Sequence, residues 1–218
     1  SDRDPFEDDP DITSRLDILL GITPCPGRHR GWAKRTEQLS HQIEKNLRQH
    51  KIKRSDQVLT DAQVPGFLIA CAYPDRIARR RHSGGYQLAN GRSASLVGNP
   101  SLGKSDWLAV AEVSGTIRSQ GDTIRSAAAL DSSLFDSALI DLVMDQTIAD
   151  WDKKTRRFIA ERRSMIGALV LNRKKLDSVP AEAKQTALIA HIKQQGIELL
   201  PWTPELRQWQ AKIILIKQ

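Results

Sequence analysis

The sequence changes character at residues 84–97, which read GGYQLANGRSASLV. Asn90-Gly91 between two apolar stretches is the strongest short-range signal for a β-hairpin. A two-residue loop would split the apolar side chains between the two faces, whereas a three-residue loop, Asn90-Gly91-Arg92, gathers them on one face. The sequence therefore predicts a hairpin with the longer loop, whose shared face carries Tyr86, Leu88, Ala94 and Leu96.

Further short strand-like stretches follow the hairpin, at residues 107–117, 123–130 and 166–171, with two more on either side of 152–155. Between them, Asp131 is a suitable N-cap for one helix. That helix would carry Leu134, Phe135, Ala138, Leu139, Leu142 and Val143 on one side. Short strands interrupted by a single helix favour a small barrel over a layered α/β sheet.

Helices are predicted on both sides of these strands. The first begins at Asp9 or Asp11, a second covers residues 32–49, and a third covers 63–73 and is apolar enough to require burial. Near the other end of the sequence, Pro180 and Gly196 bound one helix, and Thr203-Pro204-Glu205 begins another. The predicted fold class is α+β, with helices, a small barrel and then helices.

Composition excludes several classes of protein. The chain has 218 residues, of which 39% are hydrophobic and 27% charged, as expected for a globular protein. No apolar run approaches the roughly 20 residues of a membrane-spanning helix, and the first residues are too polar for an uncleaved secretory signal. Two cysteines cannot form a disulfide framework. The simplest interpretation is a reduced, cytoplasmic protein without membrane partners.

The charge is unevenly distributed. The net charge is +7, but residues 1–20 carry seven carboxylates against two arginines, so the rest of the chain carries +12. A basic body suggests a polyanionic partner, most often nucleic acid. Plain solubility is the alternative explanation.

The richest basic run is residues 76–82, which read RIARRRH and are followed by an aromatic residue. Guanidinium groups bind phosphates well because their planar donors can bond two oxygens at once, and a nearby ring can stack on an unpaired base. A second run surrounds a predicted turn near residue 154. The alternatives are ion pairs with acids, a core position for the aromatic ring, and lysines that are simply solvated. The candidate nucleic-acid-binding residues of the two runs are Arg76, Arg79, Arg80, Arg81 and Tyr86, then Lys153, Lys154, Arg156 and Arg157.

One motif match is interpreted as coincidental. Residues 98–105 read GNPSLGKS and fit the phosphate-binding loop of nucleotide-binding enzymes through Gly98, Gly103, Lys104 and Ser105. That loop works only between a strand and a long helix, whose N-terminus faces the phosphates. The residues that follow here are too few and too strand-like for such a helix. No metal-ligand spacing or catalytic constellation is present either, so we expect no metal, no bound cofactor and no catalytic residue.

Several stretches in order resemble the HrpB family of bacterial DEAH-box ATP-dependent helicases. They are AYPDRIARRR at 72–81, YQLANGR at 86–92, WLAVAE at 107–112, RRSMIGALVL at 162–171 and LPW at 200–202, with SDRDP at 1–5. The resemblance implies a helical bundle segment over 1–80, an OB-like β-barrel over 81–175 and the start of a C-terminal helical extension over 176–218.

The resemblance also implies a function. Family members carry two RecA-like motor lobes with the true phosphate loop and DEAH box, which bind ATP and Mg²⁺. Neither is present here, so we expect an accessory segment with no ATPase activity of its own, partnered by the motor lobes of its parent chain. By analogy, residues 79–81 and barrel loops such as that of Arg92 would contact single-stranded nucleic acid, RNA rather than DNA. The alternative function is a scaffold that docks the motor lobes or an acidic partner.

Overall fold

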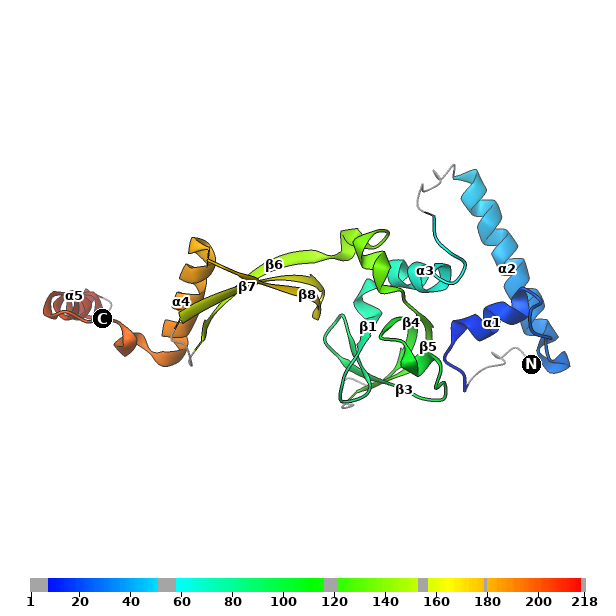
Figure 1. The fold of residues 1–218 in the computed structure, drawn as a ribbon, viewed down its shortest axis with the longest axis horizontal. Helices are drawn as coiled ribbons and strands as arrows, with labels where there is room; N and C mark the ends of the chain where they lie inside the picture. Colours follow the sequence, from blue (N-terminus) through cyan, green and yellow to red (C-terminus); the bar gives the residue numbers. More distant parts are fainter. Residues whose placement is uncertain (1–7, 51–57, 116–120, 153–156, 179, 217–218) are drawn as a thin grey trace. The chain divides into compact units, whose positions relative to one another are not determined.

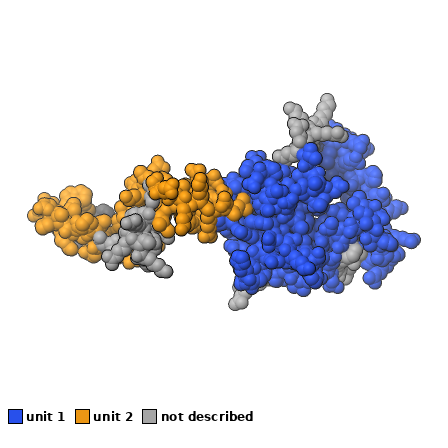
Figure 2. Space-filling view, viewed as in Figure 1, with its two compact units in different colours: residues 1–144, 165–170 blue, residues 145–164, 171–218 orange. Residues whose placement is uncertain are grey.

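The computed structural model describes residues 8–50, 58–115, 121–152, 157–178 and 180–216. The chain divides into two compact units, coloured separately in Figure 2. The first comprises Ser1–Met144 with Met165–Val170, and the second comprises Asp145–Ser164 with Leu171–Gln218. Each unit is described by itself below.

The first unit contains a closed five-stranded barrel (Figure 1). Its strands are β1 (Ile77–Arg80), β2 (Tyr86–Leu88), β3 (Ser93–Leu96), β4 (Trp107–Ser114) and β5 (Asp122–Ala129). They close in the order β1-β2-β3-β5-β4, with every pair antiparallel except β3 and β5, which are parallel. The α+β class with an OB-like barrel, expected from the sequence, is thereby confirmed.

The barrel is held by one apolar core. Alternate side chains of a strand point to opposite faces, so each strand contributes its inward set. The core consists of Ala78, Tyr86, Leu88, Ala94, Leu102, Leu108, Val110, Ile124 and Ala127, with Leu96 and Val113 packed against it. The predicted shared face of the hairpin is therefore correct.

The predicted hairpin loop is displaced by one residue. Tyr86 pairs with Ala94, and the Leu88 amide donates to the Arg92 carbonyl at 2.9 Å. The three loop residues are therefore 89–91 and not 90–92. Gly91 adopts a φ of 89° in this turn, a conformation that glycine tolerates at little cost. Because the displacement shifts the pairing by two residues in total, the side chains keep their faces.

The barrel was expected over residues 81–175, but three of the strands in that range are not part of it. Strands β6 (Met144–Asp152), β7 (Arg157–Ile166) and β8 (Leu169–Leu176) form a separate three-stranded sheet. The later strands are not needed because β1 takes part in the barrel, although its residues precede the range 81–175 in which the barrel was expected. Because β1 pairs with both β2 and β4, it closes the barrel without a later strand. The turn Met165–Val170 belongs to the barrel unit, where the Ala168 amide donates to the Ala89 carbonyl at 2.7 Å.

The helix predicted from Asp131 is wrong. Asp131 does cap, by accepting from the Ser133 amide at 2.9 Å, but only short 3₁₀ turns follow, at Ser132–Asp136 and Ile140–Leu142. Ser137 interrupts the helical backbone between them, with φ −139° and ψ −100°. Two turns suffice to bury the apolar residues Leu134, Phe135 and Leu139, and the Phe135 ring packs edge-on against Trp107 with ring centroids 4.8 Å apart.

The other predicted helices are confirmed. They are α1 (Ile12–Leu19), α2 (Arg30–Gln49), α3 (Val64–Ala72), α4 (Ala181–Gln195) and α5 (Pro204–Ile216). Asp11 caps α1 by accepting from the Thr13 amide at 2.9 Å. Helix α3 packs on β4 and β5 so closely that a Cβ on Gly66 would collide with the Ala129 carbonyl oxygen. No helix in the described ranges is long and apolar enough to cross a membrane.

Candidate nucleic-acid interface

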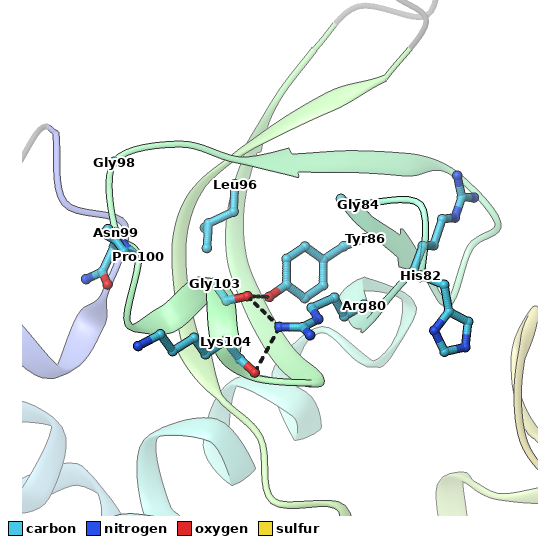
Figure 3. A pocket seen from close by; sticks show the side chains of 12 residues that line it. Arg80, His82, Gly84, Tyr86, Leu96, Gly98, Asn99, Pro100, Gly103 and Lys104 are labelled. Atoms are coloured by element: carbon cyan, nitrogen blue, oxygen red, sulfur yellow. Dashed lines mark hydrogen bonds between the residues drawn. The ribbon is translucent and has the colours of Figure 1, made fainter.

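An open groove of about 630 Å³ lies at one end of the barrel (Figure 3). Since neighbouring strands run in opposite directions, the β1–β2 turn and the β3–β4 loop meet at this end, and they form its two walls. The walls carry the basic residues Arg80, Arg81, His82 and Lys104, and the floor is made by Tyr86 and Leu96. No carboxylate is among the described residues that line it. The groove is therefore a basic depression over an apolar floor.

Arg80 connects the two walls. Its Nη1 donates to the carbonyl oxygens of Gly103 at 3.1 Å and Lys104 at 3.2 Å, drawn as dashed lines in Figure 3. Its Nε lies 3.7 Å from Oδ1 of Asp106, an exposed ion pair that contributes little to stability. Arg80 therefore ties the β3–β4 loop to the barrel, and Asp106 offsets part of its charge.

Arg81 and Lys104 line the groove, and neither forms an ion pair with a carboxylate of the described residues. Nη1 of Arg81 donates to the Ser93 hydroxyl at 3.0 Å, which orients the guanidinium but leaves its charge in place. Lys104 is exposed, and its ammonium has no hydrogen-bond or ion-pair partner in the part of the chain that the structure describes. These two groups are free to bind an anion that enters the groove.

Tyr86 does not serve as a stacking platform. Its side chain is only 3% exposed and belongs to the barrel core. Its hydroxyl donates to the Ser105 carbonyl oxygen at 2.9 Å. Burial raises the pKa of Tyr86, and the nearby Arg80 charge opposes the shift without cancelling it. Its assignment as a nucleic-acid-binding residue is corrected, because a ring in a packed core cannot stack on a base.

Arg76 and Arg79 lie outside the groove. Arg79 precedes Arg80 on β1, so its side chain points to the opposite face of the strand. It donates to the Val170 carbonyl oxygen, and its guanidinium lies over the Trp107 ring, 5.2 Å from the centroid. Arg76 donates to the Ala111 carbonyl oxygen at 2.8 Å and lies 4.6 Å from the Tyr73 ring centroid. The basic run is thus divided among different surfaces of the barrel.

Arg92 is bound to a carboxylate and is removed from the candidate site. Its Nε and Nη2 donate to the two carboxylate oxygens of Asp122 at 2.7 and 2.6 Å, and Asp122 is 5% exposed. The hydrogen bond from Arg92 outweighs the effect of burial and lowers the pKa of Asp122. This planar, bidentate pair joins the residue before β3 to the first residue of β5 and leaves little of the guanidinium charge for a ligand.

The second basic patch cannot be placed. Lys153, Lys154 and Arg156 lie outside the described residues. The backbone of Arg157 begins β7, but its side chain is outside them as well.

The segment Gly98–Ser105 forms the β3–β4 loop, and a strand follows it where a nucleotide-binding loop would have a long helix. Only one short 3₁₀ turn, Leu102–Lys104, lies within it. Gly98 has a φ of 95°, and a Cβ there would collide with the Asp8 carbonyl oxygen, so the need for glycine has a local packing cause. In the described part of the chain, no three His, Cys, Asp or Glu residues gather as a metal site would require.

Lys104 is the groove residue that sequence reasoning missed. In the sequence it stands out only as part of the coincidental nucleotide-binding motif. The strand pattern carried a usable signal, because loops that follow β1 and β3 of an antiparallel meander must lie at the same end. That signal places Lys104 at the same end of the barrel as Arg81.

Three comparisons with known proteins agree. Residues 142–176, which span β6 to β8, match the family model described as ATP-dependent RNA helicase HrpB, connector region. The chain is 28% identical over 184 residues to a curated Escherichia coli K12 protein, ATP-dependent RNA helicase HrpB, covering 84% of this chain and 22% of that protein. It is also similar to two crystal structures of E. coli HrpB, described as a DExH-box NTPase and a DEAH/RHA helicase. Their TM-scores are 0.64 and 0.60, their identities 27% and 26%, and each match covers 94% of this chain and 23% of the other.

The chain thus spans less than a quarter of the relatives that it matches. The matches cover the barrel unit as well as the connector strands, since they extend over most of the chain. On these findings the chain is similar to an accessory region of HrpB that includes the connector.

Proposed function

We propose that this region binds the backbone of single-stranded nucleic acid, RNA rather than DNA, for the motor lobes of its parent chain. The observation that carries the proposal is the basic groove, which Arg80, Arg81, His82 and Lys104 line with no carboxylate among the described lining residues. The curated relative is named an ATP-dependent RNA helicase, which supports a nucleic-acid ligand.

Each residue type has a distinct part in this binding. Arg81 and Lys104 contact phosphate oxygens, which fix the position of a strand but carry no sequence information. Arg80 acts on the protein itself by holding the loop that presents Lys104. ATP and Mg²⁺ are bound by the RecA-like lobes of the parent chain, so this region contributes no catalytic residue of its own.

The test is the salt dependence of single-stranded RNA binding by this chain. Each phosphate that a protein cation neutralises contributes about −0.7 to the slope of log affinity against log salt. Two contacts therefore predict a loss of roughly sevenfold in affinity between about 50 and 200 mM salt. An affinity that does not change with salt, or no binding at the low-salt limit, would contradict the proposal.

Docking to the motor lobes is the second candidate function, and α2 is the observation that favours it. Its residues Leu39, Ile43 and Leu47 form an exposed apolar row at helical spacing. If this row docks the lobes, Ile43→Glu should weaken the association of this chain with separately expressed motor lobes and leave RNA affinity unchanged. Equal association of the variant and the wild type would exclude that row as the docking face.

A further inference from the structure

The segment before α1 is docked on the barrel beside the groove. The Pro10 carbonyl oxygen accepts from the Ala127 amide of β5 at 2.7 Å, and Asp11 pairs with Ala127 in a parallel bridge. Pro10 is buried there. This backbone pairing thus fixes where the two preceding residues, Asp8 and Asp9, contact the β3–β4 loop.

Asp9 forms a side-chain hydrogen bond to that loop. Nδ2 of Asn99 donates to its Oδ1 at 2.8 Å, while the Ser14 hydroxyl donates to its Oδ2 at 2.6 Å. The Asp11 amide adds a third bond at 3.0 Å. Burial opposes ionisation, but the bonds from Asn99, Ser14 and Asp11, with the Arg15 charge, together lower the pKa of Asp9. The carboxylate is therefore ionised, oriented and able to hold Asn99 in one position.

Asn99 transmits this restraint into the loop. Its Oδ1 accepts from the Leu102 amide at 2.9 Å, and its carbonyl oxygen accepts from the Gly103 amide at 3.1 Å. These bonds close the short turn that ends at Lys104. Asn99 itself lines the groove, as do its neighbours Gly98 and Pro100 (Figure 3). The loop wall is thus held by Asp9 through Asn99 on one side and by Arg80 on the other.

We propose that Asp9 and Asn99 are positioning residues for the groove, so that docking of the segment before α1 sets its affinity for a nucleic-acid backbone. This inference rests on the proposed function. The positioning pair couples the N-terminal helical segment to the groove, and release of the segment weakens binding although neither residue is a cation that contacts a phosphate.

The direction in which Asp9→Ala changes RNA affinity distinguishes a positioning role from a simple charge effect. Asp9→Ala removes a negative charge beside a basic groove, so electrostatics alone would strengthen RNA binding. Positioning has the opposite effect, and we expect binding to weaken by about fivefold, the effect of losing one ordinary hydrogen bond. The matched control is Asp8→Ala, because Asp8 is an exposed neighbour of the same charge. The control should bind as well as the wild type or slightly better.

Three further variants complete the test. Asn99→Ala should weaken binding as much as Asp9→Ala does, and the double variant should show no additional loss, because residues that act as one unit are not additive. Asp9→Asn keeps an oxygen acceptor for Asn99 and should restore affinity to within about twofold of the wild type. Thermal unfolding of each variant, followed by circular dichroism, identifies any that fails to fold, and Asn99→Ala leaves the caps of α1 intact.

The outcomes distinguish this inference from the function on which it rests. If Lys104→Glu leaves RNA affinity unchanged, the groove is not the binding site and both fail. If Lys104→Glu weakens binding but Asp9→Ala and Asn99→Ala behave like Asp8→Ala, the groove binds RNA and the positioning proposal is overturned. Weakening in both alanine variants, with recovery in Asp9→Asn, supports the coupling.

Discussion

The two ends of the barrel carry similar basic turns in very different surroundings. At the β2–β3 end, Arg92 is bound by both oxygens of the nearly buried Asp122. At the β1–β2 end, Arg81 donates to a hydroxyl and Lys104 has no described partner. The same type of charge thus stabilises the fold at one end and is available to a ligand at the other. Cation content therefore identifies a binding surface only after the carboxylates have been placed.

Strand pairing explains the difference. Because β3 and β5 run parallel, Ala94 lies level with Asp122, and the turn before β3 brings Arg92 within reach of that carboxylate. At the groove end, the nearby carboxylate Asp106 is largely exposed and its ion pair with Arg80 is long. Salt screens such an exposed pair, so Asp106 offsets the positive charge of the groove only weakly.

The largest expected effect is at the Arg92 end. Asp122→Ala removes the acceptor of two charge-assisted hydrogen bonds, so we expect the free energy of unfolding to fall by about 2 kcal/mol. Urea denaturation measures this loss, and RNA affinity should stay unchanged. Asp106→Ala, at the opposite end, is the matched control and should cost less than about 0.5 kcal/mol. A loss of RNA affinity in Asp122→Ala without a loss of stability would break the distinction between the two ends.

At the groove end, substitutions should lower RNA affinity and leave stability nearly unchanged. Arg81→Glu combined with Lys104→Glu should lower single-stranded RNA affinity at least about tenfold, or about 1.4 kcal/mol of binding free energy, because both phosphate-binding cations become repulsive. Stability should change by less than about 0.5 kcal/mol per surface substitution. Filter binding and urea denaturation give the two numbers. Arg125→Glu is the control for a charge reversal outside the groove, because Arg125 is an exposed arginine of β5 bonded only to the Ser114 hydroxyl among the described residues.

A smaller effect on the free energy of unfolding should appear at acidic pH, where Asp122 becomes protonated. The pKa of Asp122 lies below its ordinary value of 3.8, so the Arg92–Asp122 pair stabilises the fold above that pH. The contribution decreases once the pH falls below 3.8 and is lost as the pH passes the lower folded value. The difference in unfolding free energy between the wild type and Asp122→Asn should therefore be constant near neutral pH and shrink below about pH 4. A constant difference down to pH 2 would show that Asp122 is not the titrating group.

The smallest expected effect is on nucleotide turnover. Lys104 lies in a loop that precedes a strand, so the helix N-terminus that would bind phosphates is missing there. Lys104→Ala should leave any background ATP hydrolysis by this chain unchanged in a coupled turnover assay. Activity in the wild type that disappears in the variant would restore the nucleotide-binding interpretation of residues 98–105.

Local features of the fold could be predicted well. Asp11 caps α1, Gly196 ends α4 with a φ of 92°, and the Thr203 hydroxyl accepts from the Leu206 amide at 3.3 Å at the start of α5. The shared face of the hairpin was also correct. The failures came where a local pattern allowed two structures, as at Ser137, where two 3₁₀ turns replace the predicted helix and still bury Leu134, Phe135 and Leu139.

Candidate site residues were predicted less well, because the sequence shows charges but not their partners. Arg80 and Arg81 do line a groove, yet Arg76 and Arg79 donate to backbone carbonyl oxygens elsewhere on the barrel. Tyr86 belongs to the core, as one of the interpretations of the basic run allowed.

By itself, the sequence determined what depends on neighbours within a few residues: helix caps, apolar periodicity and the faces of a hairpin. Only the tertiary structure decided that Ile77–Arg80 closes the barrel, because this strand is recognisable by its pairing with β2 and β4 and not by its composition. It also decided which charges are neutralised. Arg92 and Asp122 are 30 residues apart, and Asp9 and Asn99 are 90 apart, so their hydrogen bonds exist only after the strands have paired.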